Sequence, residues 1–343
     1  MGRPSRSERG AALLTAMVIV TLVATLAAAM VWQQWRAVQV EAAERARAQA
    51  QWILTGAIDW ARLILREDAR TGGADHLGEP WAVPLAEAKL STFLAADKDN
   101  TDDAPEAFLS GSIADVTGRY NLRHLIEATT PVAELAEQKT LQSMFEAAGV
   151  SGDLAARVAA GLRQAAPIAP TAPAAPGAPA DAASGTIVVA SSTAARGDAP
   201  LLPERIDQLV WLGVDPASIA LLEPYLTLLP VRTPVNVNTA PKEVLAGVLG
   251  IDLSSAERIV QARQRKHFRN IGELQQLLPQ GTPPPGSDRL STSSSFFEVR
   301  GRLRLDDRIV EERALVERRN LEIVPLRRQR VAGIEALGSE ASR

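Results

Sequence analysis

Side chains able to do acid–base, nucleophilic or metal chemistry are few in this sequence and lie far apart. The three histidines, His76, His124 and His267, occupy separate segments, so they form neither the Ser-His-Asp arrangement of a hydrolase nor a histidine-rich metal site. The absence of cysteine excludes thiol catalysis, cysteine-based zinc sites and disulfides. The sequence also lacks a glycine-rich phosphate loop and an HExxH zinc motif. These observations predict a protein that is not an enzyme.

One run of oxygen-bearing side chains, residues 97–103, has the character of a calcium-binding loop. It lacks the glycine that an EF-hand requires, so a solvated surface loop is the alternative interpretation. The weak metal-ligand candidates are Asp97, Asp99, Asp102 and Asp103. No cofactor is certain from the sequence, and calcium is the one that these residues would suit.

Composition sets the scale of the protein and limits its partners. The chain has 343 residues, enough for two modest domains and an anchor, and 46% of them are hydrophobic. The net charge of −3 gives no electrostatic reason to expect nucleic acid as a partner. Without cysteine, the fold must be held together by packing.

The N-terminus predicts a membrane anchor. A leader over residues 1–10 carries three arginines and is followed by an uncharged stretch, residues 11–35, of about 25 residues. As one helix this stretch is long enough to cross the hydrocarbon core, and Trp32 and Trp35 suit the membrane–water interface. Apolar residues continue at near-helical spacing as far as Ile64, which predicts a single long helix whose second half lies on a globular domain.

How the N-terminus is processed is left open by these features, and two ordinary interpretations apply. A secretory signal peptide would be cleaved after Ala27-Ala28-Ala29, although its apolar core is usually shorter than this one. A plain signal anchor would not be cleaved at all.

The central part predicts short strands followed by helices. Residues 113–122 indicate a strand, a turn at Gly118 and a second strand. Helical patterns dominate residues 127–290, and an Ala/Pro-rich stretch, residues 165–200, is predicted to be a disordered loop within them.

Residues 235–274 predict two helices joined by a tight hairpin. Thr239 is the expected N-cap of the first helix, with Pro241 near its start, and Gly250 is its expected C-terminal stop. Asp252 and Glu257 lie near the hairpin, and arginines follow on the second helix. A structural hairpin with a solvated charged face and a phosphate-binding hairpin are both compatible with this pattern.

The C-terminal part predicts an antiparallel sheet. Residues 296–305 alternate apolar and charged side chains, Asp306-Asp307 suits a hairpin turn, and residues 309–316 return. A third strand from Leu321 is expected to end near Pro325, with the closing strands in residues 291–330 and a tail in residues 331–343. A sheet covered on one face needs a cover, and the second half of the N-terminal helix is the expected one.

Several of these features resemble the minor pseudopilin K family of the bacterial type II secretion system. Gly10-Ala11 resembles a prepilin peptidase cleavage site, and Thr15 stands at the fifth mature position, where this family lacks the usual Glu. One family-like motif consists of Asp115, Gly118, Arg119, Tyr120, Asn121 and Leu122. A second, at the start of the helix-hairpin-helix, consists of Asn236, Asn238, Thr239, Ala240 and Pro241.

The resemblance implies an α+β fold, in which a pilin-like long helix packs on an antiparallel sheet and a helix-hairpin-helix or SAM-like insertion interrupts it. Residues 36–126 would form the first part of the pilin-like domain, before the insertion. The implied role is at the tip of the pseudopilus, starting assembly or limiting filament length, without enzymatic activity. Calcium in loops is another property that the resemblance implies.

Implied partners are the I- and J-type minor pseudopilins, the major pseudopilin, prepilin peptidase and inner membrane lipid, with no nucleic acid expected. The implied location is the inner membrane, with a single pass and a periplasmic globular part. Because the second motif also resembles competence-type modules, the alternative is a membrane-anchored DNA-binding protein of an uptake system.

Overall fold

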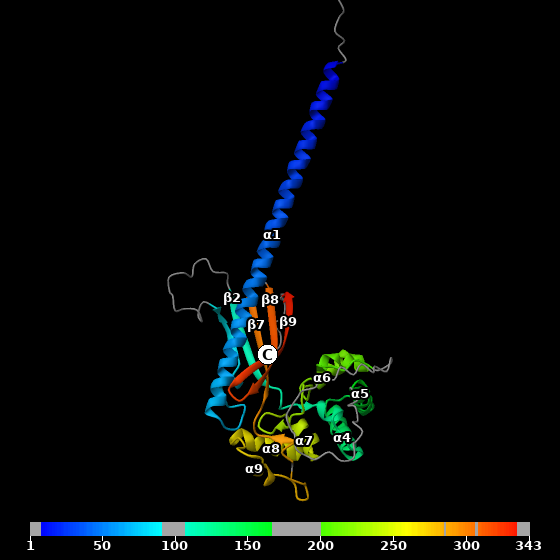
Figure 1. Ribbon diagram of the computed structural model, residues 1–343, viewed down its shortest axis with the longest axis vertical. Helices are drawn as coiled ribbons and strands as arrows, with labels where there is room; N and C mark the ends of the chain where they lie inside the picture. The colour runs from blue at the N-terminus through cyan, green and yellow to red at the C-terminus, as the bar shows by residue number, and fades with distance from the viewer. Residues whose placement is uncertain (1–7, 91–106, 167–199, 285, 306–307, 335–343) are drawn as a thin grey trace, which may run out of the picture.

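A 64-residue helix, α1 (Glu8–Thr71), is the longest element of the protein and projects far beyond its body (Figure 1). The computed structural model describes residues 8–90, 107–166, 200–284, 286–305 and 308–334. The upper part of α1 contains a window of mean hydropathy 2.4 with none of its surface buried, so by length and composition the helix can cross a membrane. The predicted single long helix is confirmed.

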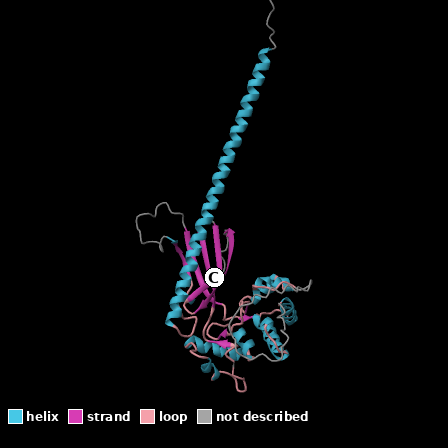
Figure 2. Cartoon of the chain, in the orientation of Figure 1, coloured by secondary structure: helices cyan, strands magenta, loops and turns pink. Residues whose placement is uncertain are grey.

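The lower part of α1 packs on the body through one face. Ala50, Leu54, Ile58, Ala61 and Leu65 recur at helical spacing and are all buried, each at most 5% exposed. This apolar stripe covers one face of the sheet, as the sequence predicts. Figure 2 shows the strands, in magenta, beside the lower half of the helix.

The sheet has five antiparallel strands in the order β1-β2-β7-β8-β9. Their bounds are Leu85–Lys89, Ala107–Asp115, Phe296–Leu305, Arg308–Arg319 and Glu322–Ile334. Phe297, Val299 and Leu303 alternate into the core, and the side chains between them face outward. At Gly301 an added Cβ would stand 3.3 Å from Leu54 of α1, so glycine lets the helix lie close to the strand.

Two predictions about the last strand are wrong. The strand does not end near Pro325, because β9 continues to Ile334. The tail does not begin at residue 331 either, because residues 331–334 still belong to β9. Pro325 is tolerated because β9 is the edge strand and its register with β8 shifts between Leu315 and Val316.

A separate helical domain lies at the end of the body away from the projecting part of α1 (Figure 1). Its helices are α3 (Arg123–Ile126), α4 (Pro131–Ala147), α5 (Gly152–Ala165), η2 (Ile206–Leu212), α6 (Pro216–Leu222), α7 (Lys242–Leu249), α8 (Leu253–Arg265) and α9 (Ile271–Gln275). Two short parallel strand pairs, β3 (Tyr120–Asn121) with β4 (Leu226–Thr227) and β5 (Val235–Asn236) with β6 (Leu290–Ser291), tie its segments together.

The chain enters the helical core earlier than expected. Tyr120, Leu122 and Leu125, which the sequence analysis assigns to the first pilin-like segment, are buried in the helical core instead. The reason is that Tyr120 and Asn121 pair with β4, which belongs to the helical domain. A short 3-10 helix, η1 (Pro80–Ala82), stays with the sheet, where Trp81 packs edge-on against Phe297 with ring centroids 5.3 Å apart. Helix α5 extends through Ala165, the first residue of the expected loop, and residues 167–199 of that loop lie outside the described residues.

Candidate functional site: the domain junction and the exposed helix

The two family-like motifs, about 120 residues apart in sequence, meet at the junction between the sheet and the helical domain. Asp115, at the end of β2, accepts hydrogen bonds through Oδ2 from the Thr239 hydroxyl at 2.6 Å and the Asn236 amide at 3.1 Å. Its Oδ1 accepts from the backbone N–H and the hydroxyl of Thr117, at 2.8 and 2.6 Å. The Ser294 hydroxyl also donates to Asp115, at 2.5 Å. One carboxylate therefore holds three segments together.

Gly118 completes this contact by leaving room for the second motif. A Cβ on Gly118 would lie 2.6 Å from Oγ1 of Thr239 and 3.1 Å from its carbonyl carbon. A side chain at this position would push the Thr239 hydroxyl away from Asp115 and press on the backbone of Thr239. The glycine is thus explained by close approach of the two motifs, with Ala240 fully buried beside it.

The asparagines of the motifs satisfy buried backbone groups. Asn121 accepts from the N–H of Leu229 at 3.2 Å and donates to the carbonyl of Val231 at 2.7 Å. Asn238 makes two 2.9 Å hydrogen bonds to Phe268, one to its N–H and one to its carbonyl. Amide side chains suit this task because each carries both a donor and an acceptor.

The remaining motif residues have structural positions. Leu122 is fully buried, and Tyr120 donates from its hydroxyl to Glu137 at 2.7 Å. Pro241 precedes α7 as its N-terminal flanking residue. The expected N-cap role of Thr239 is wrong, because Pro241 occupies the N-cap position of α7, and the Thr239 hydroxyl donates to Asp115 instead. Gly250 ends α7 with a left-handed φ of 65°, which confirms it as the C-terminal stop.

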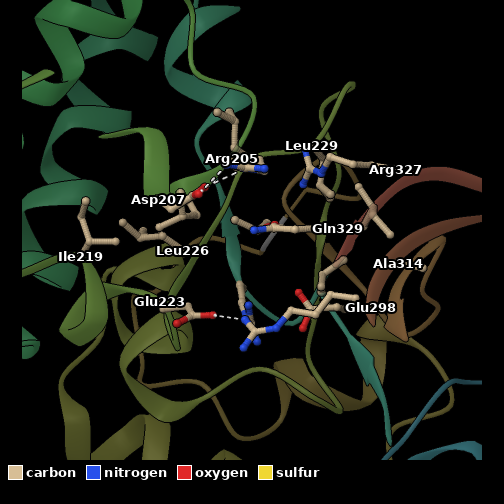
Figure 3. Close-up of a pocket in the computed structure, with 17 residues that line it drawn as sticks. Arg205, Asp207, Ile219, Glu223, Leu226, Leu229, Glu298, Ala314, Arg327 and Gln329 are labelled. Carbon is tan, nitrogen blue, oxygen red and sulfur yellow. Dashed lines mark hydrogen bonds and ion pairs between the residues drawn. The ribbon is translucent and has the colours of Figure 1, made fainter. Parts of the chain in front are cut away.

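Arg119 lines a polar cavity of about 230 Å³ between the helical domain and the outer face of the sheet (Figure 3). Acidic side chains that line the cavity form ion pairs with neighbouring arginines. Asp207 binds Arg205 at 2.6 Å, and Glu223 lies 3.8 Å from Arg313. The charges line a seam between domains and offer no arrangement for acid–base catalysis.

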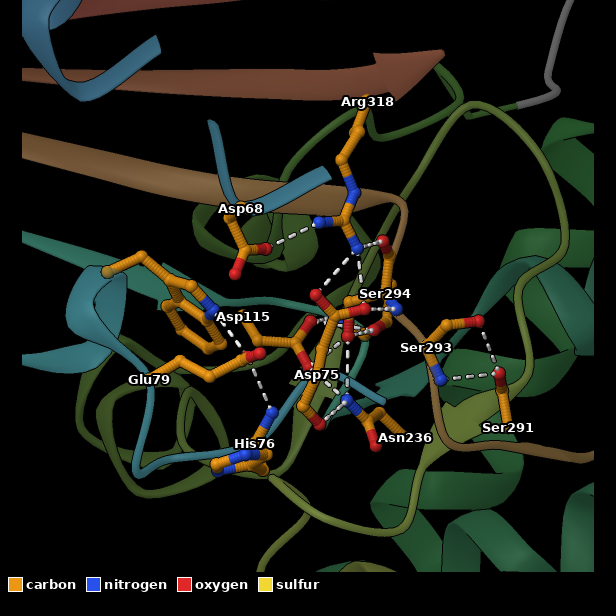
Figure 4. A network of polar contacts seen from close by, with 12 residues as sticks. Asp68, Asp75, His76, Glu79, Asp115, Asn236, Ser291, Ser293, Ser294 and Arg318 are labelled. Carbon is orange, nitrogen blue, oxygen red and sulfur yellow. Dashed lines mark hydrogen bonds and ion pairs between the residues drawn. The ribbon is translucent and has the colours of Figure 1, made fainter. Parts of the chain in front are cut away.

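A second polar cluster, which no sequence pattern predicts, lies beside the hydrogen bonds of Asp115 (Figure 4). Arg318, near the end of β8, donates to Asp68 of α1 at 2.8 Å and to both oxygens of Asp75 at 2.6 and 2.5 Å. It also donates to the carbonyl of Ser294 at 2.7 Å. The Asp75 side chain is only 4% exposed and that of Arg318 12%. This cluster fastens the end of α1 to the sheet and to the segment that leaves the helical domain.

Three carboxylates of this cluster, from Asp68, Asp75 and Glu79, each place an oxygen within 4.8 Å of the others. Burial, followed by the charges of Glu79 and Asp75, raises the pKa of Asp68 to about 6, although Arg318 acts in the opposite direction. Arg318 pairs with both Asp68 and Asp75, so a calcium ion would have to compete with its guanidinium for these oxygens. Glu79 in turn accepts from the indole N–H of Trp81 at 2.7 Å. The metal candidates named from the sequence, Asp97, Asp99, Asp102 and Asp103, lie outside the described residues.

The helix hairpin uses its charged residues for its own structure. Asp252 caps α8 by accepting from the N–H of Ser255 at 2.9 Å. Hydrogen bonds from the Ser254 and Ser255 hydroxyls, together with this N–H, hold the pKa of Asp252 well below its usual range. Arg263 donates to the carbonyl of Val237 at 2.6 Å, and burial lowers the pKa of its guanidinium to about 10. Lys242 pairs with Glu257 at 3.1 Å. Arg263 and Lys242, two of the positive charges near the hairpin, are thus already bound to groups of the protein itself.

We therefore expect no salt-sensitive binding of duplex DNA. A protein that binds DNA through its phosphates loses affinity steeply between about 50 and 200 mM salt. Arg263 is bound to the backbone, and the negative charge of Asp252 at the hairpin repels phosphate, so such binding is not expected here. Fluorescence anisotropy of a soluble fragment starting at Trp35, titrated with duplex DNA, measures this. Submicromolar binding at physiological salt that Arg265→Ala weakens would contradict the expectation. Arg263→Ala is a poor probe, because it removes a hydrogen bond of the fold.

The exposed half of α1 is the other candidate functional surface. Its large apolar side chains, among them Leu14, Val23 and Trp35, are 55–66% exposed. Gly10 and Ala11 lie in the first turn of α1. The Thr15 hydroxyl donates to the carbonyl of Ala12 at 2.9 Å, which lets a polar side chain stand within the apolar stretch. A surface this apolar requires lipid or other helices around it.

An apolar N-terminal helix that projects from a sheet and packs on it through its second half defines a pilin-like protein. The sequence model of the family described as "Type II secretion system (T2SS), protein K" matches residues 235–293, which include the second motif and the whole hairpin. Over these residues the chain is similar to the protein K family.

The similarity to curated protein K sequences extends over nearly the whole chain. The type II secretion system protein K of Pseudomonas aeruginosa is 27% identical over 309 residues, covering 88% of this chain and 86% of the relative. Protein K of Pectobacterium carotovorum is 25% identical over 335 residues, covering 94% and 96%. In a solved structure of the GspK-GspI-GspJ complex from enterotoxigenic Escherichia coli, one chain shares the fold with a TM-score of 0.59 and 18% identity. That match covers 84% of this chain and 98% of the other.

Proposed function

We propose that this minor pseudopilin of type II secretion acts at the tip of the pseudopilus, where it starts assembly or limits filament length. The observation that carries the proposal is the position of the helical domain, at the end of the body opposite the exposed half of α1 (Figure 1). In a filament whose subunits are all anchored by α1-type helices, that domain obstructs the place where a further subunit would sit above this one.

The contacts of the junction support a rigid cap. The helical domain is held by Asp115 and by the Arg318 cluster, so it does not swing away from the sheet as a tethered appendage would. Ring stacking of His76 on His267, with centroids 3.9 Å apart, adds a contact between the segment after α1 and the helical domain. A rigid obstruction is what a cap requires.

The proposed partners are the I- and J-type minor pseudopilins and, below them, the major pseudopilin. In the proposal α1 spans the inner membrane once and the globular part lies in the periplasm. Prepilin peptidase cuts between Gly10 and Ala11, and the role involves assembly without catalysis. Association in the membrane would rest on packing between apolar helices in lipid.

The missing Glu at position 15 provides the test. A tip subunit has no neighbour ahead of it whose terminal amine would pair with a carboxylate, so Thr15→Glu would bury an unpaired acid at a cost of about 2.5–3.5 kcal/mol at the helix centre and less near the interface. Bacteria that carry Thr15→Glu should secrete their exported proteins at an unchanged or reduced level. Bacteria that carry Thr15→Val, which adds no charge, should secrete them normally. Long filaments formed by Thr15→Glu alone would show that the missing Glu, and not the helical domain, keeps the subunit at the end.

A further inference from the structure

The cavity between the helical domain and the outer face of the sheet holds more guanidinium groups than acids able to pair with them (Figure 3). Its charged lining consists of four arginines and three acids, namely Arg119, Arg205, Arg313, Arg327, Asp207, Glu223 and Glu298. Each of the three acids already forms an ion pair, Asp207 with Arg205 and both glutamates with Arg300. The acids are therefore neutralised, whereas some of the arginines are not.

Two of the lining arginines, Arg119 and Arg327, form no ion pair within the part of the chain that the structure describes. The Arg327 guanidinium donates to the carbonyl of Glu204 at 2.8 Å, which leaves its charge uncompensated. Burial, followed by the positive charge of Arg205, lowers the pKa of Arg327, although an arginine side chain stays protonated at physiological pH. A half-buried cation of this kind attracts an anion strongly, because little water screens it.

Positive charge is concentrated at one end of the cavity. Figure 3 shows Arg205 and Arg327 together at this end, whereas Glu223 and Glu298 lie toward the other. Arg205 donates two hydrogen bonds to Asp207, at 2.9 and 2.6 Å, so these two charges cancel. The net charge of this end therefore comes from Arg327.

The remaining walls limit what the anion can be. They are largely apolar and include Ile206, Ile219, Leu226, Leu229 and Leu315. Pockets for drug-sized ligands measure about 300–1,000 Å³, so this cavity of about 230 Å³ suits a smaller group. A doubly charged phosphate would be repelled by the acids of the lining, whereas a carboxylate carries one charge and matches the planar guanidinium.

We propose that this inter-domain cavity binds a carboxylate attached to a small apolar group, with Arg327 holding the carboxylate and the apolar walls receiving the group beside it. The C-terminal residue of a polypeptide chain and a short branched acid both offer this chemistry. Because Arg327 belongs to β9 and Arg205 to the helical domain, a bound carboxylate joins the two domains. The site does not depend on a position at the filament tip.

The test measures the melting temperature of the full chain in detergent, in a chloride buffer, as N-acetylleucine is added. Saturating N-acetylleucine should raise the melting temperature by about 2–5 °C, because a ligand that binds only the folded state stabilises it. N-acetylleucine amide, which has the same apolar group without a carboxylate, should leave it unchanged. Isovalerate, a free branched acid, distinguishes the two sources. Equal affinity for isovalerate indicates a free acid, and affinity at least tenfold weaker indicates a chain end.

Arg327→Gln should weaken the binding of N-acetylleucine by about tenfold or more, because it removes a charge-assisted hydrogen bond. Arg328→Gln is the matched control and should bind normally, because Arg328 is the next residue of β9, is exposed and pairs with Ala314 of the opposite face. Asp207→Asn releases Arg205 from its ion pair and should tighten binding.

The outcomes that contradict the proposal are specific. Equal shifts with N-acetylleucine and its amide would show that the carboxylate is not recognised, and no shift with either would show that the cavity is not a ligand site. Binding that Arg327→Gln leaves unchanged would overturn the role of that residue. If Arg327→Gln melts at a lower temperature without ligand, Asp207→Asn provides the decision, because N-acetylleucine binding that it does not tighten overturns the proposal.

Discussion

Replacing Arg318 with alanine should destabilise the protein by about 3–5 kcal/mol, because it leaves a buried carboxylate without its counter-ion. Asp75 is 3% exposed and binds Arg318 through both oxygens, and Asp68 loses the same partner. The change also removes the donor to the carbonyl of Ser294. Urea unfolding of a soluble fragment starting at Trp35 should show the loss as a lower midpoint with little change in slope.

Arg319→Ala is the matched control, because Arg319 is the next residue of β8 and pairs at the surface with Glu317. Its side chain is 58% exposed, and exposed pairs contribute about 0–1 kcal/mol. Arg318→Lys should fall between the two, because an ammonium keeps the charge but lacks the planar guanidinium that reaches several acceptors at once. If Arg318→Ala and Arg319→Ala unfold at the same urea concentration, the cluster is not what fastens α1 to the sheet.

Asp115→Ala should destabilise the protein by about 2–4 kcal/mol and loosen the helical domain from the sheet. The buried N–H of Thr117 loses its acceptor, the Thr117 hydroxyl keeps only Ser294 as an acceptor, and the Thr239 hydroxyl loses its link to β2. Because this carboxylate bridges the two domains, differential scanning calorimetry should resolve two transitions that lie closer together in the unaltered protein.

Asp207→Ala provides the control, since Asp207 is 56% exposed and pairs with Arg205 at the surface. It should leave the calorimetric profile unchanged. Limited proteolysis gives an independent measurement, because loosened domains expose the connecting segments around residues 116–119 and 292–295. A profile of Asp115→Ala that is identical to that of Asp207→Ala would contradict the bridging role of Asp115.

The long helix and the closing sheet are predictable from local patterns alone. Apolar spacing of three and four residues predicts α1, and alternation from Phe296 to Leu305 predicts a strand with one covered face. Both patterns repeat within a short window, so one sequence is enough to recognise them. Pro325 misleads because a rule for strand interiors does not apply at an edge strand with a register shift.

The junction is not predictable in this way. Asp115 and Thr239 are 124 residues apart, and Arg318 and Asp75 are 243 apart, so no periodicity connects them. The resemblance to a family identifies the two motifs but not that they bind each other. Thr239 illustrates the difficulty, because its position before a helix favours a capping role until the tertiary contact with Asp115 is known.

The identity of the mature N-terminus tests most directly the central claim, that this chain is a pseudopilin anchored by its whole apolar helix. Mass spectrometry of the protein purified from membranes should find a chain that starts at Ala11, with the entire apolar stretch retained. Changing Gly10 to a bulky residue should block this processing. A mature chain that starts at Met30 would mean that a signal peptide had been removed after Ala29, and it would contradict the account.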